Sequence, residues 1–422
     1  MLVDVLVIGA GVIGLACAFR LAREGQRVLL LDRNAPGLGA SFGNAGHIAT
    51  EQIFPLASPE TVRGALRYLF DRESPLRYLF DREGPLQIRP GYLLPILPWL
   101  VRFAWAARQR SFDRGVAALS SLQHTAAADL AALLRDASAT LRLKMNGHLV
   151  LVENPASVNA AKAEILRLAK FGVDSNWLPP TAVRELVPDI TAPIQGAMKF
   201  SGTGHVDDPY GVCKSLFDAF LAAGGKFIQS DVSRVDASTT DITVHGTDGT
   251  PHTATNLILC CGAWSKALAA QLGYVVPLDT ERGYHISLPG IVPRFDIPIA
   301  SYERKIIMTP MSGGLRMTGT VEFGGLALAP DPGRFELLKR HMNALAPSIS
   351  TQDATTWMGF RPSMPDHLPV LGRVPDGRKI YFAFGHQHLG LTLAGVTARI
   401  MAAEVMGRKT EIDLSPFAAN RF

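Results

Sequence analysis

The chain has 422 residues, 47% hydrophobic and 19% charged, so it can form two domains, or one domain with a large insertion, and is too apolar for wholesale disorder. Its net charge of +5 is spread without a Lys/Arg tract, which argues against a nucleic-acid partner. The four cysteines contain no CxxC pair, so they indicate neither a metal site nor a redox dithiol. They are typical of reduced thiols in a cytoplasmic protein. No apolar run reaches the roughly 18 residues that a membrane-spanning helix needs.

The first residues predict a strand (3–8), a helix (12–23) and a second strand that ends at Asp32, which together make a compact βαβ unit. Gly9 permits a tight turn, Gly11 lets the backbone approach a pyrophosphate, and Gly14 lets the helix pack closely on the strand. Asp32 is placed to accept from a ribose hydroxyl, which suits FAD and NAD equally. The residues of this unit expected to contact a dinucleotide are Gly9, Gly11, Val12, Ile13, Gly14, Asp32 and Arg33.

The next segment, 60–140, reads as mainly helical and contains a tandem duplication. LRYLFDRESP (66–75) is followed at once by LRYLFDREGP (76–85). Two copies are too few for a solenoid, and Pro75 and Pro85 are expected to divide them into short helical pieces. We interpret the duplication as a longer surface or lid segment.

Residues 92–106 hold two tryptophans and short apolar runs interrupted by Pro95 and Pro98. The simpler interpretation is a helix packed in the substrate domain. The alternative is a segment that dips into a membrane interface.

Later segments return to alternating strands and helices. We expect strands at 148–152, 257–261 and 379–384, helices at 156–170 and 391–406, and a β-rich stretch at 284–323. Strand–helix units at the start, middle and end predict an α/β protein in which a discontinuous Rossmann-like domain carries an α+β substrate domain with a mixed or antiparallel sheet. The expected boundaries are 1–60, 195–270 and 366–422 for the dinucleotide-binding domain, and 61–194 and 271–365 for the substrate domain.

Seven motifs in order carry a family resemblance that runs essentially end to end, apart from the duplication. They are VLVIGAGVIG (5–14), GASFGNAGHIA (39–49), HVDDPYGV (205–212), LILCCGAWS (257–265), ERGYHI (281–286), GFRPSMPDHLPVLG (359–372) and FGHQHLGLT (384–392). The sequence resembles the D-amino-acid oxidase superfamily of FAD-dependent oxidoreductases, and most closely its D-amino-acid dehydrogenase branch. The resemblance implies FAD, and makes the discontinuous domain an FAD-binding domain.

The resemblance also implies further cofactor contacts. It places the small-residue loop at 41–46 along the flavin, Val232 at the adenine, and the strand–helix turn at 262–264 beside the ADP moiety. It also places the C-terminal turn at 385–392 at the flavin, where the dipole of the following helix stabilises the reduced ring. These contacts are Ser41, Asn44, Ala45, Gly46, Val232, Gly262, Trp264, Gly385, Gly390, Leu391 and Thr392. Sarcosine-oxidase relatives attach flavin through a cysteine, and no cysteine follows Cys261, so we expect noncovalent FAD.

For the substrate, Arg361 matches the arginine that grips the carboxylate in the family, where a guanidinium binds two oxygens at once. Tyr284 and Arg282 are second candidates for the carboxylate or the active-site wall. Arg316 stands where sarcosine-oxidase relatives carry a lysine that promotes reaction with oxygen, which favours a dehydrogenase. Arg316 is also a candidate for a second carboxylate or substrate contact. His47, expected near the ring face, and His386 complete the predicted substrate site.

The expected activity is oxidation of a D-amino or cyclic D-imino acid, such as a D-alanine-like acid, D-proline or hydroxy-D-proline, with hydride transfer to flavin N5 and electrons passed to a quinone or another acceptor. An oxygen-using amine oxidase of the glycine or sarcosine type is one alternative. A flavoprotein subunit of an electron-transfer complex is another. We expect a cytoplasmic location, with peripheral contact at the inner face of the membrane as the variant.

Overall fold

The computed structural model describes residues 3–70, 84–238 and 241–422. Its first sheet has eight strands, five of them parallel as in a dinucleotide-binding fold. The parallel strands run in the order β10 (Lys226–Gln229), β2 (Val28–Asp32), β1 (Val3–Ile8), β13 (Pro251–Leu259) and β20 (Ile380–Phe384). The antiparallel strands are β11 (Val232–Ala237), β12 (Ile242–Gly246) and β19 (Val370–Arg373). The predicted βαβ unit is present.

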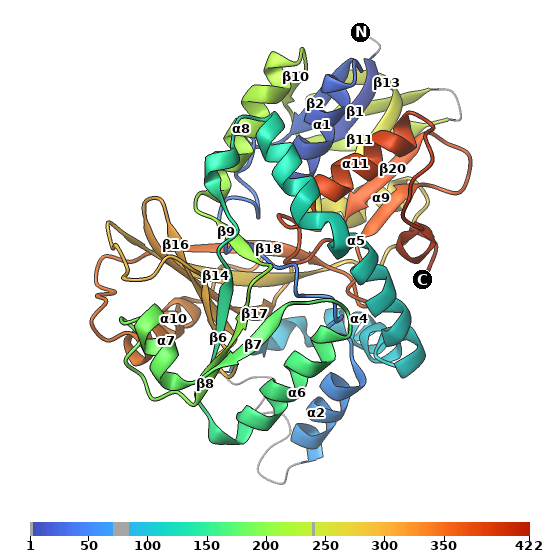
Figure 1. Ribbon diagram of the computed structural model, residues 1–422. Helices are drawn as coiled ribbons and strands as arrows, with labels where there is room; N and C mark the ends of the chain where they lie inside the picture. The colour runs from blue at the N-terminus through green and yellow to red at the C-terminus, as the bar shows by residue number, and fades with distance from the viewer. Residues whose placement is uncertain (1–2, 71–83, 239–240) are drawn as a thin grey trace.

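Helices pack on this sheet because their apolar faces have no other place to be buried. The first helix, α1 (Val12–Arg23), is buried along almost its whole length against β1, β2, α8 and α11. The others around the sheet are α5 (Gln109–Asp136), α8 (Pro209–Ala222), α9 (Ser265–Gln271) and α11 (Ala394–Val405). Figure 1 shows this unit in the upper half of the molecule, with α5 descending along one side toward the lower half.

The second sheet has nine strands and lies in the lower half of Figure 1. Its pairs are antiparallel except β15–β6 and β17–β4, so it is a mixed sheet as predicted. In spatial order the strands are β18 (Thr355–Ser363), β14 (Asp279–Pro289), β17 (Gly314–Phe323), β16 (Ile306–Met311), β15 (Ile299–Ser301), β6 (His148–Val152), β8 (Gly196–Phe200) and β7 (Ser175–Leu178), with β4 (Leu86–Ile88) beside β17. The helices near it are α2 (Pro59–Phe70), α4 (Leu93–Ala106), α6 (Val158–Ala169), α7 (Pro180–Leu186) and α10 (Pro332–Leu345).

A small three-stranded sheet joins chain segments that are far apart in sequence. It pairs β3 (His47–Ile48) with β9 (Gly204–Val206), and β9 with β5 (Leu143–Lys144). β8 (Gly196–Phe200), which lies inside the predicted FAD-binding segment 195–270, pairs with β6 and β7 of the second sheet. We propose that the cofactor-binding part of this segment begins near α8, and the other domain boundaries stay predictions.

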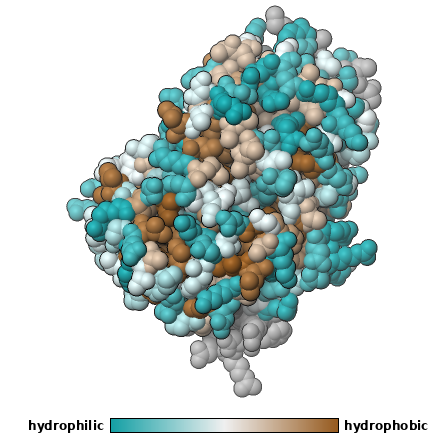
Figure 2. Space-filling model, in the orientation of Figure 1, coloured by the Kyte–Doolittle hydropathy of each residue, from teal (hydrophilic) through white to brown (hydrophobic). Residues whose placement is uncertain are grey.

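The segment predicted to be a packed or interfacial helix forms α4. One side buries Ile96 and Trp99, while Leu94, Val101 and Trp105 are exposed. Within the part of the chain that the structure describes, no helix has both the length and the apolar content needed to cross a membrane. Figure 2 shows polar side chains over most of one face, with apolar ones in small groups.

The duplicated segment is described only in part. The first copy begins inside α2, and residues 71–83 lie outside the described residues. The predicted helical pieces of the duplication therefore stay a prediction.

Candidate active site

A cavity of 1460 Å³ is lined by both sheets, larger than the roughly 300–1,000 Å³ typical of a small-ligand pocket. Most of the predicted cofactor residues line it: Gly9, Gly11, Val12, Ile13, Asp32, Arg33, Ser41, Asn44, Ala45, Gly46, Val232, Gly262, Trp264, Gly385, Gly390 and Leu391. Arg361, His47 and His386 line it as well. One cavity thus joins the predicted dinucleotide residues to the predicted carboxylate-binding arginine.

The glycine turn is as tight as the motif predicts. A Cβ on Gly9, whose φ is +105°, would lie 2.4 Å from the carbonyl oxygen of Cys260, and one on Gly14 would lie 1.7 Å from the Gly9 oxygen. Gly14 therefore sits behind the turn and lets α1 approach β1, and it does not line the cavity. Ser41 accepts the Val12 N–H at 2.9 Å, which ties the small-residue loop to the start of α1.

The acid at the end of β2 is held by backbone donors. Asp32 Oδ2 accepts from the Ala10 N–H at 2.7 Å and Oδ1 from the Asn34 N–H at 2.8 Å. The next residue, Arg33, lies over the Trp264 ring, 4.8 Å from its centroid. The Asp32 carboxylate and this cation–aromatic pair both line the cavity, together with the glycine turn.

Two side chains of the second sheet hold the small-residue loop. His285 Nδ1 lies 2.8 Å from the carbonyl oxygen of Gly43 and donates to it, and Arg316 Nη1 donates to the Asn44 carbonyl at 2.8 Å. Burial lowers the pKa of Arg316 to about 10. Arg316 does not line the cavity, so the structure gives it a role in positioning the loop and not the predicted contact with substrate.

The C-terminal turn closes another side of the cavity. Gly385 has φ +80°, in the region that favours glycine, and Leu391 lines the wall just before α11. Thr392 is fully buried and accepts the Ala49 N–H at 3.0 Å, so it anchors the strand–loop segment after His47 and does not face the cavity. His386 lines the wall, and its Nε2 lies 3.0 Å from the Thr397 hydroxyl.

Polar groups without partners and strained backbone mark the wall of the cavity. Among the described residues, the hydroxyls of Thr318 and Thr320 and Nε2 of Gln387 are buried without a hydrogen-bond partner. Four of the five non-glycine residues with positive φ in the described chain line this cavity: Lys305, Thr320, His367 and Gln387. Buried orphan donors and backbone strain both concentrate at ligand sites. The wall therefore fits a polar ring cofactor such as a flavin.

Arg361 projects across β14 toward this wall. Its Nη1 donates to the Thr320 carbonyl at 3.3 Å, and a Cβ on Gly283 would lie 2.4 Å from its Cζ. Burial lowers the pKa of Arg361, and Glu281, its register partner on β14, opposes that shift. The absence of a side chain at Gly283 therefore makes room for the Arg361 guanidinium in the cavity.

Arg282 and Tyr284 are not part of the cavity, which corrects their prediction as substrate contacts. Side chains alternate between the faces of a strand, so these two point away from the face that carries Glu281 and Gly283. Arg282 is fully buried and donates to Glu322, and the Tyr284 hydroxyl donates to Glu322 Oε2 at 3.1 Å. Both residues are committed to the packing under α10.

Several further residues line the cavity, and none of them was a predicted site residue. They are Glu51, His148, Glu281, Gly283, Lys305, Thr318, Thr320, His367, Gln387 and His388. Gln387 and His388 stood inside the quoted C-terminal motif, and Glu281 and Gly283 inside ERGYHI. His367 stood inside the motif at 359–372. The others carried no local signal, because only the assembled fold brings them to the cavity.

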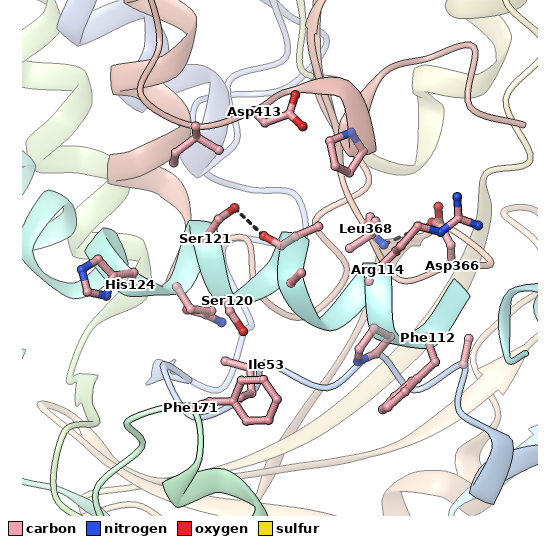
Figure 3. Close-up of a pocket in the computed structure, with 18 of the residues that line it drawn as sticks. Ile53, Phe112, Arg114, Ser120, Ser121, His124, Phe171, Asp366, Leu368 and Asp413 are labelled. Carbon is pink, nitrogen blue, oxygen red and sulfur yellow. Dashed lines mark hydrogen bonds between the residues drawn. The ribbon is translucent and has the colours of Figure 1, made fainter. Parts of the chain in front are cut away.

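A second cavity, of 1730 Å³, runs along α5. Figure 3 shows Phe112, Ser120 and His124 on this helix, with Ile53 and Phe171 on one side and Asp413 on the other. None of the predicted cofactor residues lines it, nor does Arg361. The candidate active site is therefore the cavity between the sheets.

The fold and this cavity define a dinucleotide-binding oxidoreductase. The family model for FAD dependent oxidoreductases matches residues 4–404, and the chain belongs to this family. It is 33% identical to a D-amino-acid oxidase of Bradyrhizobium diazoefficiens, over 99% of this chain and 98% of that one. It is 30% identical to D-amino acid dehydrogenase 2 of Ralstonia nicotianae, over 99% of this chain and 100% of that one.

Solved structures share the fold. A glycine oxidase from Geobacillus kaustophilus superposes with a TM-score of 0.74 at 21% identity, covering 100% of this chain and 99% of that one. An L-proline dehydrogenase from P. horikoshii superposes with a TM-score of 0.70 at 17% identity, covering 100% of this chain and 98% of that one. The recognised family, the fold class and the FAD dependence predicted from the sequence are confirmed, and the chain is an FAD-dependent oxidoreductase of the amino-acid oxidase and dehydrogenase type.

Proposed function

We propose that the protein oxidises a D-amino acid or a cyclic D-imino acid, such as a D-alanine-like acid, D-proline or hydroxy-D-proline. The observation that carries this proposal is Arg361, partly buried in the wall of the cofactor cavity. Its guanidinium makes one hydrogen bond among the described residues, to Thr320, which leaves donors for a carboxylate. The D-configuration is supported by the names of the relatives at 30% and 33% identity.

Bound FAD would supply the hydride acceptor, at flavin N5. Arg361 would fix the substrate carboxylate, and hydride loss from a neutral amine needs no general base. Burial lowers the pKa of His367, His386 and His388 to about 3 each, so these cavity histidines are uncharged at neutral pH. Arg361 therefore faces the substrate carboxylate without competition from charged imidazoles around it. Positioning by these groups is the chain's main contribution to catalysis.

The test is anaerobic bleaching of the flavin by a panel of D- and L-amino and imino acids. We expect bleaching by D-acids and none by their L-enantiomers. Cyclic and acyclic D-acids of similar size are compared to define the substrate class. Bleaching by L-acids alone would contradict the stereochemical proposal, while a colourless purified protein would contradict the cofactor instead.

For the acceptor, we propose a dehydrogenase that passes electrons to a quinone or a similar compound. The competing candidate is an oxygen-using oxidase. It is favoured by the name of the Bradyrhizobium relative and by a lysine in the cavity wall, Lys305, whose pKa is lowered by burial. Rates of peroxide formation and dye reduction are measured on one preparation. Dye reduction far faster than peroxide formation is expected, and equal rates would favour the oxidase.

We also propose a cytoplasmic protein that contacts the inner membrane face through α4. Leu94, Val101 and Trp105 are 80%, 61% and 62% exposed on this helix, and Arg108 lies against Trp105. Apolar side chains beside arginines suit an anionic lipid surface. Sedimentation with anionic vesicles should retain the wild type more than a variant with serine at these three apolar positions. Equal retention would contradict the contact.

A further inference from the structure

Three side chains with metal-binding atoms meet in the wall of the same cavity. His47 lies in β3, Glu51 follows it by four residues, and His148 is the first residue of β6. One ligand atom from each lies within 4.8 Å of the other two. We propose that these three side chains bind a divalent transition-metal ion of the Zn²⁺ class.

Three polar atoms of this group lack hydrogen-bond partners within the described residues. Among the described residues, neither ring nitrogen of His148 and not Oε2 of Glu51 makes a hydrogen bond, although the two residues are only 4% and 7% exposed. A buried polar atom left without a partner destabilises the fold, so a cluster of them is best explained by a ligand. His148 is held in place by stacking on Phe200, at 5.7 Å between ring centroids.

One hydrogen bond to the backbone orients His47 as a metal ligand. Its Nδ1 lies 3.2 Å from the Gly204 carbonyl oxygen, and a carbonyl only accepts, so Nδ1 carries the proton. Nε2 is then the coordinating nitrogen, and it lies 2.9 Å from Oε1 of Glu51. Metal-binding histidines commonly donate their other ring N–H to a backbone carbonyl in this way.

The donor set selects the class of ion. Two imidazoles and one carboxylate suit Zn²⁺ and its neighbours, whereas Mg²⁺ and Ca²⁺ prefer oxygen ligands. Three protein ligands leave one position of a tetrahedral ion open. Because all three side chains line the cavity, that position faces the cavity. The cysteine pattern gave no sign of this site, since its donors are His47 and Glu51, four residues apart, and His148, which is distant in sequence.

The experiment titrates the flavin-loaded protein, after treatment with EDTA and dialysis, with ZnCl₂ in a calorimeter. We expect one Zn²⁺ per chain and no comparable binding of Mg²⁺. The variants His148→Gln and Glu51→Gln should each bind Zn²⁺ at least about tenfold more weakly, because each removes one of three ligands. Cobalt added to the wild type should give visible absorption bands at wavelengths longer than the flavin bands.

His205→Gln is the matched control. His205 is also fully buried with both ring nitrogens unpartnered among the described residues, and its backbone pairs with His47, but it is not one of the three ligands. Its variant should bind Zn²⁺ like the wild type. Absorbance of the bound flavin verifies folding in each variant, and if His148→Gln loses FAD, Glu51→Gln decides. Absence of stoichiometric Zn²⁺ binding, or equal weakening in His205→Gln, would overturn the proposal.

Discussion

Replacing Gly283 by alanine tests whether Arg361 is the substrate-binding group. A Cβ at this position would lie 2.4 Å from Cζ and Nη2 of Arg361 and 2.7 Å from Nη1. The atoms in conflict belong to the end of a long side chain and not to the backbone. We therefore expect the fold to tolerate the alanine while the guanidinium moves.

The size of the effect follows from that displacement. Ordinary contacts begin at 3.4 Å, so the nearest guanidinium atoms must move by about 1 Å (3.4 minus 2.4). A misplacement of about 1 Å in a positioning group costs on the order of 100-fold in rate. We expect kcat/KM to fall by about 100-fold, which corresponds to about 2.7 kcal/mol of transition-state stabilisation.

The assay is steady-state dye reduction with the best D-acid from the anaerobic screen, together with FAD content and thermal unfolding. Gly313→Ala is the matched control, because Gly313 follows β16 in a turn and a Cβ there meets nothing within 4 Å. The control should keep the wild-type kcat/KM. A Gly283→Ala enzyme with full FAD content and kcat/KM within about twofold of the wild type would refute the assignment of Arg361.

Three further predictions concern single side chains. Arg361→Lys keeps the charge but loses the paired donors, so KM should rise by about 10- to 100-fold with FAD content unchanged, and an unaltered KM would contradict the carboxylate contact. Arg316→Gln removes the donor to the Asn44 carbonyl, and apoprotein titration should show FAD bound about tenfold more weakly, whereas a changed KM with unchanged FAD affinity would support a substrate contact instead. Burial lowers the pKa of His285 to about 3, below its unfolded value near 6.5, so its contribution to stability is full above pH 6.5 and is lost as the pH falls toward 3. Between pH 6.5 and 5.0 the wild type should lose about 2 kcal/mol more in urea unfolding than His285→Phe, and equal losses would contradict the argument.

The cofactor end of the cavity could be predicted from sequence because its signals are local. The βαβ unit places its glycines, its helix and Asp32 within thirty residues, and backbone sterics at Gly9 and Gly14 leave no other residue type. The motif order then extended the prediction to distant turns such as Gly385, whose positive φ requires glycine. Short-range constraints of this kind restrict which residue types a position can hold, so they can be recognised from the sequence.

The substrate-binding part of the cavity was harder to predict from the sequence than the cofactor-binding part. Its residues come together only in the assembled fold. Lys305, Thr320 and Gln387 reach the cavity with left-handed backbones that no sequence pattern signals. His148 joins His47 because β6 and β3 belong to different sheets that approach each other in space. These contacts are properties of the assembled fold and not of any one segment.

The strand β14 explains why ERGYHI was recognised as a motif while its residues were misassigned. Its cavity face carries three residues: Glu281, whose charge interacts with Arg361, Gly283, which makes room for Arg361, and His285, which holds the small-residue loop at Gly43. The other face carries Arg282 and Tyr284, which bind Glu322 under α10. The prediction selected the larger side chains of Arg282 and Tyr284. Because successive side chains of a strand point to opposite faces, it is their smaller neighbours that face the cavity. Because β14 positions both Arg361 and the small-residue loop, a one-residue shift in its register would displace the substrate-binding and cofactor-binding groups together.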